Sequence, residues 1–274
     1  MPSVSVGVIR PQVRKSHNGE RDMTDEKLYG VHPILAALQE ERRRIGKIFI
    51  SAQRHGAEVQ RILTLAARRD IPVVTVERAQ LQQLLGHDTH QGVMALVEPH
   101  GYTPWAEVLN HVTARPGPHT MLVLDGVTDV GNFAALIRSA AAFGVYAIVL
   151  PRHHAVPLTP AVAKRSAGAI ERVAIVRVVN VVRVLDELKQ HGFWVYGADM
   201  RADLTVAHMA WPERAVLVLG AEGGGIRRLV HERCDGLVRI PMCTGTNSLN
   251  VAMAGAIILA YRWDDCVAHT ANKR

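Results

Sequence analysis

The chain has 274 residues, of which 48% are hydrophobic and 21% are charged, and its formal net charge is +7 at pH 7. This balance is typical of an ordinary soluble globular protein. The longest apolar stretch near the carboxyl terminus, Val251 to Ala260, is far shorter than the roughly 20 residues that span a bilayer.

The basic surplus indicates a polyanionic partner, and nucleic acid is the commonest one; a merely basic enzyme is the alternative. With four Phe and five Tyr, a stacking platform for bases is poorly supported, so phosphate contacts are the expected form of RNA binding. Some basic clusters will be no more than solvated helix faces. The clusters are a leader with Arg10, Arg14, Lys15 and Arg21, the run Arg42–Arg44, and the pairs Arg68–Arg69 and Lys164–Arg165.

The three cysteines and fourteen histidines show no disulfide framework and no zinc spacing. We therefore predict no metal site, and a reducing cytoplasm fits the thiols best. The cysteines are Cys234, Cys243 and Cys266.

Residues 1–25 are expected to form a basic, flexible tail, because they contain no apolar core of the secretory type. Residues 26–98 then predict a compact α/β module. Helical spacing of apolar residues marks residues 30–41 and 58–69, and short apolar runs predict strands at 47–51, 72–76 and 92–97.

Residues 99–118 are rich in proline and glycine and are expected to form a linker, with one short helix from Trp105 to Val112. From residue 119 to 274 strands and helices alternate, which predicts a mostly parallel sheet covered on both faces. The expected strands are 121–124, 145–150, 193–196, 215–219 and 237–240, and the expected helices are 133–143, 160–168, 181–191, 225–232 and 248–263.

Ligands in such sheets bind beyond the carboxyl ends of the strands, which selects three turns. In the first turn, Asp125, Asp129 or Asn132 can cap the helix that follows. Arg138 lies further along this helix among small and apolar residues. An arginine in that setting should have a partner, and the fork of its guanidinium suits a phosphate or a carboxylate.

The second turn, Gly220–Gly225, is neither a G-x-G-x-x-G fingerprint nor a P-loop, so it argues against a nucleoside triphosphate. Its glycines permit close approach of the backbone to a ligand, although a tight strand-to-helix turn would explain them equally well. The third turn offers five polar residues where a helix cap needs one. These residues are Thr244, Thr246, Asn247, Ser248 and Asn250. Gly255 and its alanine neighbours predict close packing against a second helix or across a dimer.

Together the turns resemble the SpoU/TrmH-type ribose 2'-O-methyltransferases of the SPOUT superfamily. The matching motifs are Asp125…Asn132…Arg138, Gly220–Ile226, and Ile240–Met242 followed by Ser248–Val251. Residues Leu28–His32 and His90–Val93 resemble the amino-terminal RNA-binding domain of the 23S rRNA guanosine 2'-O-methyltransferase branch, which is similar to ribosomal protein L30. Two positions depart from the family pattern, because Val130 replaces its usual proline and Ala134 its usual glycine.

The resemblance implies a SPOUT-type α/β fold: a parallel sheet with a carboxyl-terminal deep trefoil knot, preceded by a small L30-like α/β domain. Threaded chains are otherwise nearly absent from proteins, so periodicity alone would not predict the knot. The resemblance also implies a homodimer packed through the catalytic domains and bound S-adenosyl-L-methionine. The matching cofactor positions are Gly197, Ala198, Leu219, Gly220, Gly225, Ile240, Met242, Ser248 and Leu249.

By position, Arg138 matches the catalytic arginine of the family. Arginine, with a pKa above ~12, is a poor proton acceptor. We therefore interpret Arg138 as binding an RNA phosphate and stabilising the alkoxide that develops at the ribose. The residues expected to orient it, the ribose and the loops are Asn132, Glu222, Ser248 and Asn250; Glu222 could anchor either Arg138 or an amide.

The most favoured substrate is a guanosine of 23S rRNA, with tRNA as the nearest alternative. Two further alternatives are an rRNA methyltransferase of the antibiotic-resistance kind and a non-catalytic RNA-binding protein of ribosome assembly.

Overall fold

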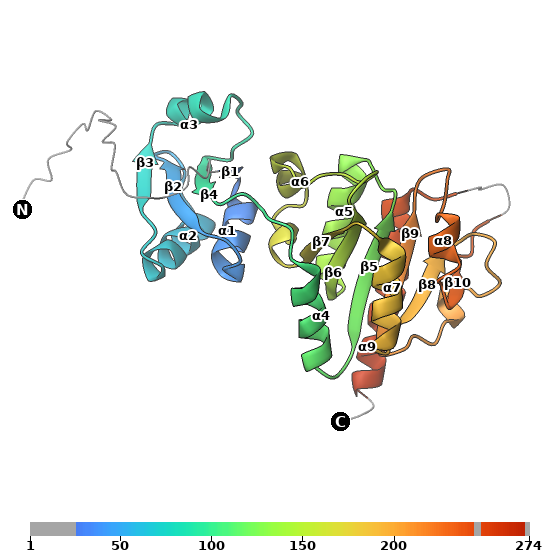
Figure 1. Cartoon of the computed structure of the whole chain (residues 1–274). Coiled ribbons are helices and arrows are strands. Elements are labelled where there is room, and N and C mark those ends of the chain that lie inside the picture. Colours follow the sequence, from blue (N-terminus) through green and yellow to red (C-terminus); the bar gives the residue numbers. More distant parts are fainter. Residues whose placement is uncertain (1–25, 244–247, 272–274) are drawn as a thin grey trace, which may run out of the picture.

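The computed structural model describes residues 26–243 and 248–271, which form two α/β domains joined by an extended segment (Figure 1). In the first domain a four-stranded sheet has the order β1-β4-β2-β3, in which only β2 and β3 run parallel. Its elements are β1 (Glu26–Tyr29), α1 (Val31–Glu40), β2 (Ile45–Ser51), α2 (Ala57–Arg68), β3 (Val73–Val76), α3 (Arg78–Leu85) and β4 (Val93–Val97).

Two elements of this domain were not predicted, namely β1 and α3. Strand β1 is only four residues long and half polar, so it carries little periodic signal. Helix α3 buries only Leu81. Its signal was the capping box, in which Glu77 and Gln80 each bond the backbone of the other.

The second domain has a six-stranded sheet with the order β10-β8-β9-β5-β6-β7, and every neighbouring pair is parallel. This confirms the predicted parallel α/β sheet. Its strands are β5 (His119–Asp125), β6 (Val145–Pro151), β7 (Ala174–Val178), β8 (Trp194–Ala198), β9 (Arg214–Gly220) and β10 (Gly236–Val238). Its helices are α4 (Trp105–Ala114), α5 (Val130–Ala142), α6 (Pro160–Arg165), η1 (Ala169–Glu171), α7 (Val181–Gln190), η2 (Val206–His208), α8 (Arg228–His231) and α9 (Val251–Ala271).

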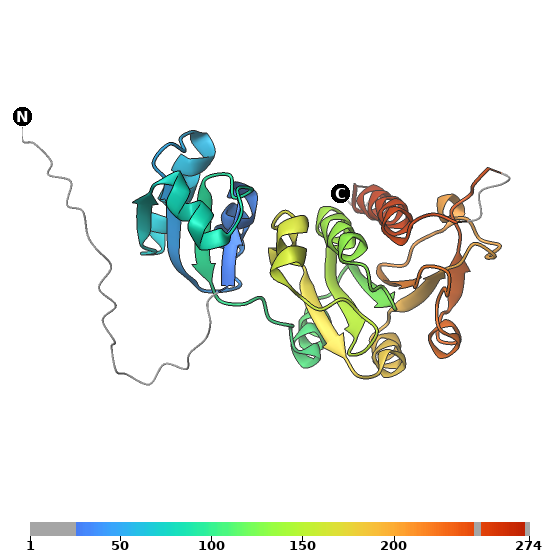
Figure 2. The same cartoon turned by 90° about the horizontal axis from the view of Figure 1, so that it is seen from above.

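Two hydrophobic cores lie on opposite faces of this sheet. One contains the buried side chains of α5, α6 and α9, and the other contains those of α4, α7 and α8. Figure 2, seen from above, shows α5 and α9 on one side of the strands and α4 and α7 on the other. The predicted coverage of both faces is therefore confirmed.

Some boundaries differ from the prediction for backbone reasons. Helix α6 ends at Arg165 rather than near Gly168, because Ala167 (φ 52°) and Gly168 (φ 84°) adopt the left-handed conformation. Helix α8 begins at Arg228, because Gly225 is held in a closed turn by two backbone hydrogen bonds with Ala221. Strand β7 was not predicted, although four of its five residues are apolar and three of them are β-branched.

The helix within the expected linker is anchored in the second domain. Val108 and Val112 of α4 are fully buried in the core that also holds α7. The Thr103 amide donates to the Ile175 carbonyl of β7 at 2.8 Å. The segment that connects the domains is therefore shorter than the breaker-rich stretch of sequence.

A buried ion pair joins the two domains. Arg43, between α1 and β2, donates through Nη2 to Glu171 Oε1 of η1 at 2.7 Å and through Nη1 to the Glu98 carbonyl at 3.0 Å. The Arg43 and Glu171 side chains are only 5% and 1% exposed. Nearby, Lys164 lies 4.7 Å from the centroid of the Tyr29 ring. Two members of the basic clusters thus form domain contacts rather than a free polyanion-binding surface.

Gly255 lies where α9 packs closely against α5 and β9. A Cβ at this position would lie 2.5 Å from Leu136 Cδ2 of α5 and 2.7 Å from Leu219 Cδ1 of β9. The predicted close approach is therefore made to a helix and a strand of the same chain.

Gly255→Val is expected to lower the free energy of unfolding by about 1–3 kcal/mol, because the added methyl groups overpack this contact. Thermal unfolding monitored by circular dichroism measures the effect. Gly101→Val is the matched control, because a Cβ at Gly101 meets nothing within 4 Å. Equal melting temperatures for the two variants would show that α9 can move aside freely.

Among the helices that the structure describes, none is long and apolar enough to cross a membrane.

Candidate active site

Three polar side chains from separate turns meet in one hydrogen-bonded cluster. Asn132 of α5 donates through Nδ2 to Glu222 Oε1 at 2.9 Å. Asn250 donates through Nδ2 to the same Glu222 oxygen at 3.0 Å and to Asn132 Oδ1 at 2.8 Å. The cluster therefore ties together all three turns that the sequence selected. Of the two partners proposed for Glu222, the structure shows amides.

Each member of the cluster is held by local structure. Asp129 caps α5 by accepting from the Asn132 amide at 2.7 Å, so Asp129 is the cap among the three candidates. Asn250 Oδ1 accepts from the Ala252 amide at 2.9 Å at the start of α9. Val130 occupies the first position of α5, where the family's proline would also fit. Replacement of that proline thus leaves the helix start intact.

Asp125, the last residue of β5, holds the Gly220–Gly225 turn in place. Its side chain is fully buried and accepts from the Arg227 backbone amide at 2.9 Å and from Arg227 Nε at 2.7 Å. A charge-assisted pair of this kind is stronger than a neutral hydrogen bond. Asp125 is therefore a support of the Gly220–Gly225 turn rather than a helix cap.

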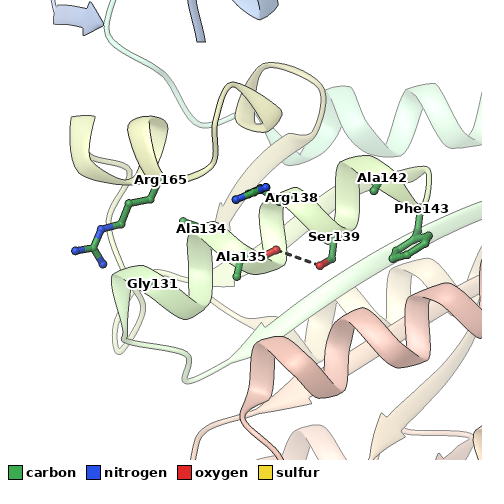
Figure 3. Close-up of a pocket in the computed structure, with 8 residues that line it drawn as sticks. All are labelled: Gly131, Ala134, Ala135, Arg138, Ser139, Ala142, Phe143 and Arg165. Carbon is green, nitrogen blue, oxygen red and sulfur yellow. Dashed lines mark hydrogen bonds between the residues drawn. The ribbon is translucent and has the colours of Figure 1, made fainter. Parts of the chain in front are cut away.

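Arg138 lies six residues beyond Asn132, about 9 Å further along the axis of α5. It is exposed, and no hydrogen bond or ion pair engages its guanidinium within the described residues. It lines a cavity of about 530 Å³ on the outer face of α5 (Figure 3). The lining residues of α5 recur at helical spacing and most are small: Gly131, Ala134, Ala135, Arg138, Ser139 and Ala142. No carboxylate among the described residues is the partner expected for Arg138. Of the two partners predicted, the phosphate of a ligand is the one still possible.

A second arginine, which the sequence did not single out as a site residue, lines the same cavity. Arg165 extends from the end of α6 toward Gly131, as Figure 3 shows. A Cβ on Gly131 would lie 3.5 Å from Arg165 Nη1. The only signal in the sequence was the basic pair Lys164–Arg165. The cavity therefore presents two guanidinium groups to a ligand.

The predicted cofactor positions gather at the carboxyl ends of three neighbouring strands. Gly197 and Ala198 end β8, Leu219 and Gly220 end β9, and Ile240 and Met242 follow β10. A Cβ on Gly220 would lie 2.1 Å from the Gly225 carbonyl carbon, so the two ends of the turn touch through their backbones. Beside Gly223 and Gly225 a Cβ would meet nothing within 4 Å, which leaves that backbone open to a ligand.

This arrangement fits a ligand that is bound mainly through backbone groups, such as the one that the resemblance implies. The strand ends offer carbonyl and amide groups with little side-chain cover, and the half-buried Ile240 and Leu249 add apolar surface. Ser248, beside Leu249, is exposed. Thr244, Thr246 and Asn247, which were expected in the third turn, lie outside the described residues.

Two pKa shifts mark the surroundings of these strand ends. Hydrogen bonds from Arg201 lower the pKa of the Asp199 carboxyl, just beyond Ala198. Burial raises the pKa of the Cys234 thiol to about 11. Cys234 Sγ lies 3.1 Å from the place of a Cβ on Gly197, so it is an inert packing group beneath the strand end. Within the described residues no group of three or more His, Cys, Asp or Glu side chains could hold a metal ion.

Asn250→Asp is expected to lower the activity of this site by about tenfold or more at neutral pH. The aspartate keeps the oxygen that caps α9 but replaces the amide donor by a carboxylate beside Glu222, and two adjacent carboxylates repel. Protonation of one of them restores a donor, so activity should partly recover as the pH falls. The measurement is a pH–rate profile of the variant against the unmodified protein; identical profiles would show that the cluster is not needed.

Comparisons with known proteins agree along nearly the whole described chain. A model of the SpoU rRNA Methylase family matches residues 119–260, and a model described as RNA 2'-O ribose methyltransferase substrate binding matches residues 27–103. The 23S rRNA (guanosine-2'-O-)-methyltransferase RlmB of Pseudomonas syringae is 38% identical over 236 residues, which cover 85% of this chain and 93% of that protein. The corresponding protein of Coxiella burnetii is 35% identical and covers 85% of this chain and 93% of its own.

Solved structures show the same fold. The SpoU methyltransferase AviRb of Streptomyces viridochromogenes, in complex with AdoMet, has a TM-score of 0.73 at 22% identity and covers 91% of this chain and 95% of its own. The AdoMet-bound rRNA methyltransferase of Sinorhizobium meliloti has a TM-score of 0.69 at 21% identity and covers 87% of this chain and 86% of its own.

Proposed function

This chain belongs to the SpoU rRNA methylase family, and we propose on that basis that its target is the ribose 2'-hydroxyl of a guanosine in 23S rRNA. The protein is an enzyme that transfers a methyl group from S-adenosyl-L-methionine to ribose in rRNA. The choice of a guanosine in 23S rRNA is supported by the similarity to RlmB. The observation that supports methyl transfer at this site is the Asn132–Glu222–Asn250 cluster, which joins the Gly220–Gly225 turn to the helix that bears Arg138.

S-adenosyl-L-methionine supplies a methyl group that is already activated as part of a sulfonium. The residues proposed to hold it are the strand ends and turns at Gly197, Ala198, Leu219, Gly220, Gly225, Ile240, Met242, Ser248 and Leu249. Their contribution is binding and orientation through backbone groups, for which the open backbone beside Gly223 and Gly225 is suited.

Arg138 is proposed to bind a phosphate of the substrate and to stabilise negative charge on the 2'-oxygen as its proton leaves. A guanidinium has five donors and no acceptor, so it cannot itself remove that proton. The proton is proposed to leave through the bound phosphate or water. Asn132, Glu222, Ser248 and Asn250 hold the loops around the reacting ribose. Exposed and unpaired among the described residues, Arg138 is free to make these contacts.

A homodimer is part of the proposal. Helix α9 exposes a series of large apolar side chains for which burial against a second copy would be favourable. These are Met253, Tyr261, Trp263 and Val267, which are 45–61% exposed. Sedimentation equilibrium should therefore give twice the chain mass of 30.0 kDa. A monomer at micromolar concentration would contradict this part.

Two further expectations belong to the same proposal. The cytoplasm is the proposed location, which the three free thiols support. The deep trefoil knot is the proposed path of the chain in the carboxyl-terminal part of the second domain, which the family membership supports.

Mapping of 2'-O-methylated positions tests the proposed target. Unmethylated 23S rRNA and tRNA transcripts are incubated separately with the protein and tritiated S-adenosyl-L-methionine, and the labelled nucleotide is then identified. We expect label at a single guanosine of 23S rRNA. Label in tRNA alone would replace the proposed target by the tRNA alternative, and no label in either would overturn the proposal.

A further inference from the structure

A second cavity, of about 390 Å³, lies in the first domain, away from the Arg138 site. Seven of its nine lining residues are polar or charged, and they come from four helices or strands and their loops. They are Val31, His32, Ser51, Gln53, Arg54, Glu58, Arg78, Gln91 and Gly92. A cavity of this size falls within the range of about 300–1,000 Å³ that is usual for small-ligand sites.

Three helices begin at this cavity. Val31, Glu58 and Arg78 lie in the first turns of α1, α2 and α3 respectively. A helix amino terminus carries partial positive charge. At α3 this charge already meets the Glu77 carboxylate of the capping box, and the first amide of α1 already donates to Gln91, so the amino terminus of α2 is the one that can favour an anion. Helix α2 has glycine at its cap position, and no side chain caps it there.

Two arginines add full positive charge to these helix ends. Arg54 Nη2 lies 3.7 Å from Glu58 Oε2, which is a long ion pair, and the Arg54 side chain is 40% exposed. Arg78 is exposed, and no ion pair engages it within the described part of the chain. The two guanidinium groups and the amino terminus of α2 together suit a phosphate group.

Gln91, which lines the cavity, has a side-chain amide that can donate to a ligand. Gln91 Oε1 accepts from the Val31 amide at 3.0 Å, which leaves its Nε2 group as a donor. Gln91 (φ 55°) and Gly92 (φ 78°) are both in the left-handed region, and a Cβ on Gly92 would lie 3.0 Å from Arg54 Cβ. Backbone strain at a non-glycine residue is often kept where it places a functional group. Buried His90 holds this turn by accepting from the Gly92 amide at 3.0 Å.

We propose that this cavity binds one unpaired nucleotide of the substrate RNA, with its phosphate on Arg54 and Arg78 and its base edge at Gln91. A concave cavity admits a nucleotide that is turned out of its helix, and such nucleotides are the usual objects of sequence-specific RNA recognition. The inference rests on the proposed function in naming RNA as the ligand. It assigns to the first domain a defined site that is separate from the methyl-transfer site.

The test is filter binding of the full-length protein to an unmethylated 23S rRNA transcript over a series of salt concentrations. The Arg54→Ala/Arg78→Ala double variant should bind about tenfold to hundredfold more weakly, since it can no longer form hydrogen bonds from charged groups to the phosphate. Its dependence of log K on log salt should be shallower by roughly 0.7 for each phosphate that the variant no longer neutralises. Arg61→Ala is the matched control, because Arg61 is exposed on α2 outside the cavity.

Two outcomes would overturn the inference. The double variant could bind as tightly as Arg61→Ala, or a fully paired RNA duplex could compete as well as the transcript. Arg54→Lys/Arg78→Lys keeps the charge and should recover part of the affinity. The melting temperature of each variant should equal that of the unmodified protein, which shows that the variant is folded.

Tritium transfer measured on the same samples separates this inference from the proposed function. The double variant should show a raised KM for rRNA with kcat within about twofold of the unmodified protein. If the unmodified protein binds the transcript through Arg54 and Arg78 but transfers no label, the proposed function fails while the cavity assignment stands.

Discussion

Replacement of Arg138 by alanine is expected to reduce methyl transfer to rRNA by about a hundredfold to a thousandfold while S-adenosyl-L-methionine still binds. Removal of one preorganised donor to a developing oxyanion costs ~2.7–4 kcal/mol of transition-state stabilisation. The proposed cofactor positions lie at the strand ends, whereas Arg138 lines the cavity on α5. Isothermal titration calorimetry with the cofactor and a tritium-transfer assay on 23S rRNA measure the two effects separately.

Two further variants sharpen this test. Arg138→Lys keeps the charge but loses the planar fork, so its activity should lie between those of the alanine variant and the unmodified protein. Arg183→Ala is the control, because Arg183 is 79% exposed on α7, on the opposite face of the sheet. Full activity of Arg138→Ala would show that another group stabilises the ribose oxygen, and loss of cofactor affinity would place Arg138 in the cofactor site instead.

Replacement of Arg43 by alanine is expected to destabilise the contact between the two domains by about 3–5 kcal/mol. The substitution leaves Glu171, which is 1% exposed, as a buried carboxylate without its guanidinium partner. For domains of this size such a loss lowers the melting temperature by ~10 °C. Differential scanning calorimetry measures it, and limited proteolysis should show faster cleavage between residues 98 and 104.

The neighbouring residue provides a matched control. Arg44 belongs to the same basic run but is exposed, so Arg44→Ala should melt within about 1 °C of the unmodified protein. The double variant Arg43→Met/Glu171→Leu removes both charges and should recover most of the stability, because an apolar pair often replaces a buried ion pair without loss. Arg43→Ala that melts like Arg44→Ala would show that the ion pair does not hold the domains together.

The basic run Arg42–Arg44 shows that composition cannot predict which member of a charged cluster is buried. Arg42, Arg43 and Arg44 are equivalent in the sequence, and their clustering predicted contact with a polyanion. In the structure Arg43 is buried against the other domain, whereas Arg42 and Arg44 are exposed. Burial of one member depends on where Glu171 falls, 128 residues further along the chain. The pattern of residues around Arg43 in the sequence therefore cannot predict a contact with a residue so far along the chain.

The sequence alone determined the alternation of strands and helices, the parallel sheet, and the three turns that bear polar residues. These follow from periodicity and from the rule that ligand sites lie beyond the carboxyl ends of parallel strands, both of which are local or general. These turns contain Asn132, Glu222 and Asn250, so the sequence predicts them as candidates without reference to their contacts.

Only the tertiary structure decided which groups those residues meet. In the structure the Glu222 carboxylate accepts from two amides rather than from Arg138. Asp129 is the residue that caps α5. Asp125 accepts from Arg227 and so supports the Gly220–Gly225 turn. The tertiary structure also added Arg165 to the Arg138 cavity and gathered three helix starts around a second cavity in the first domain. Each of these outcomes depends on distances between segments far apart in the chain, which packing sets and spacing along the sequence does not.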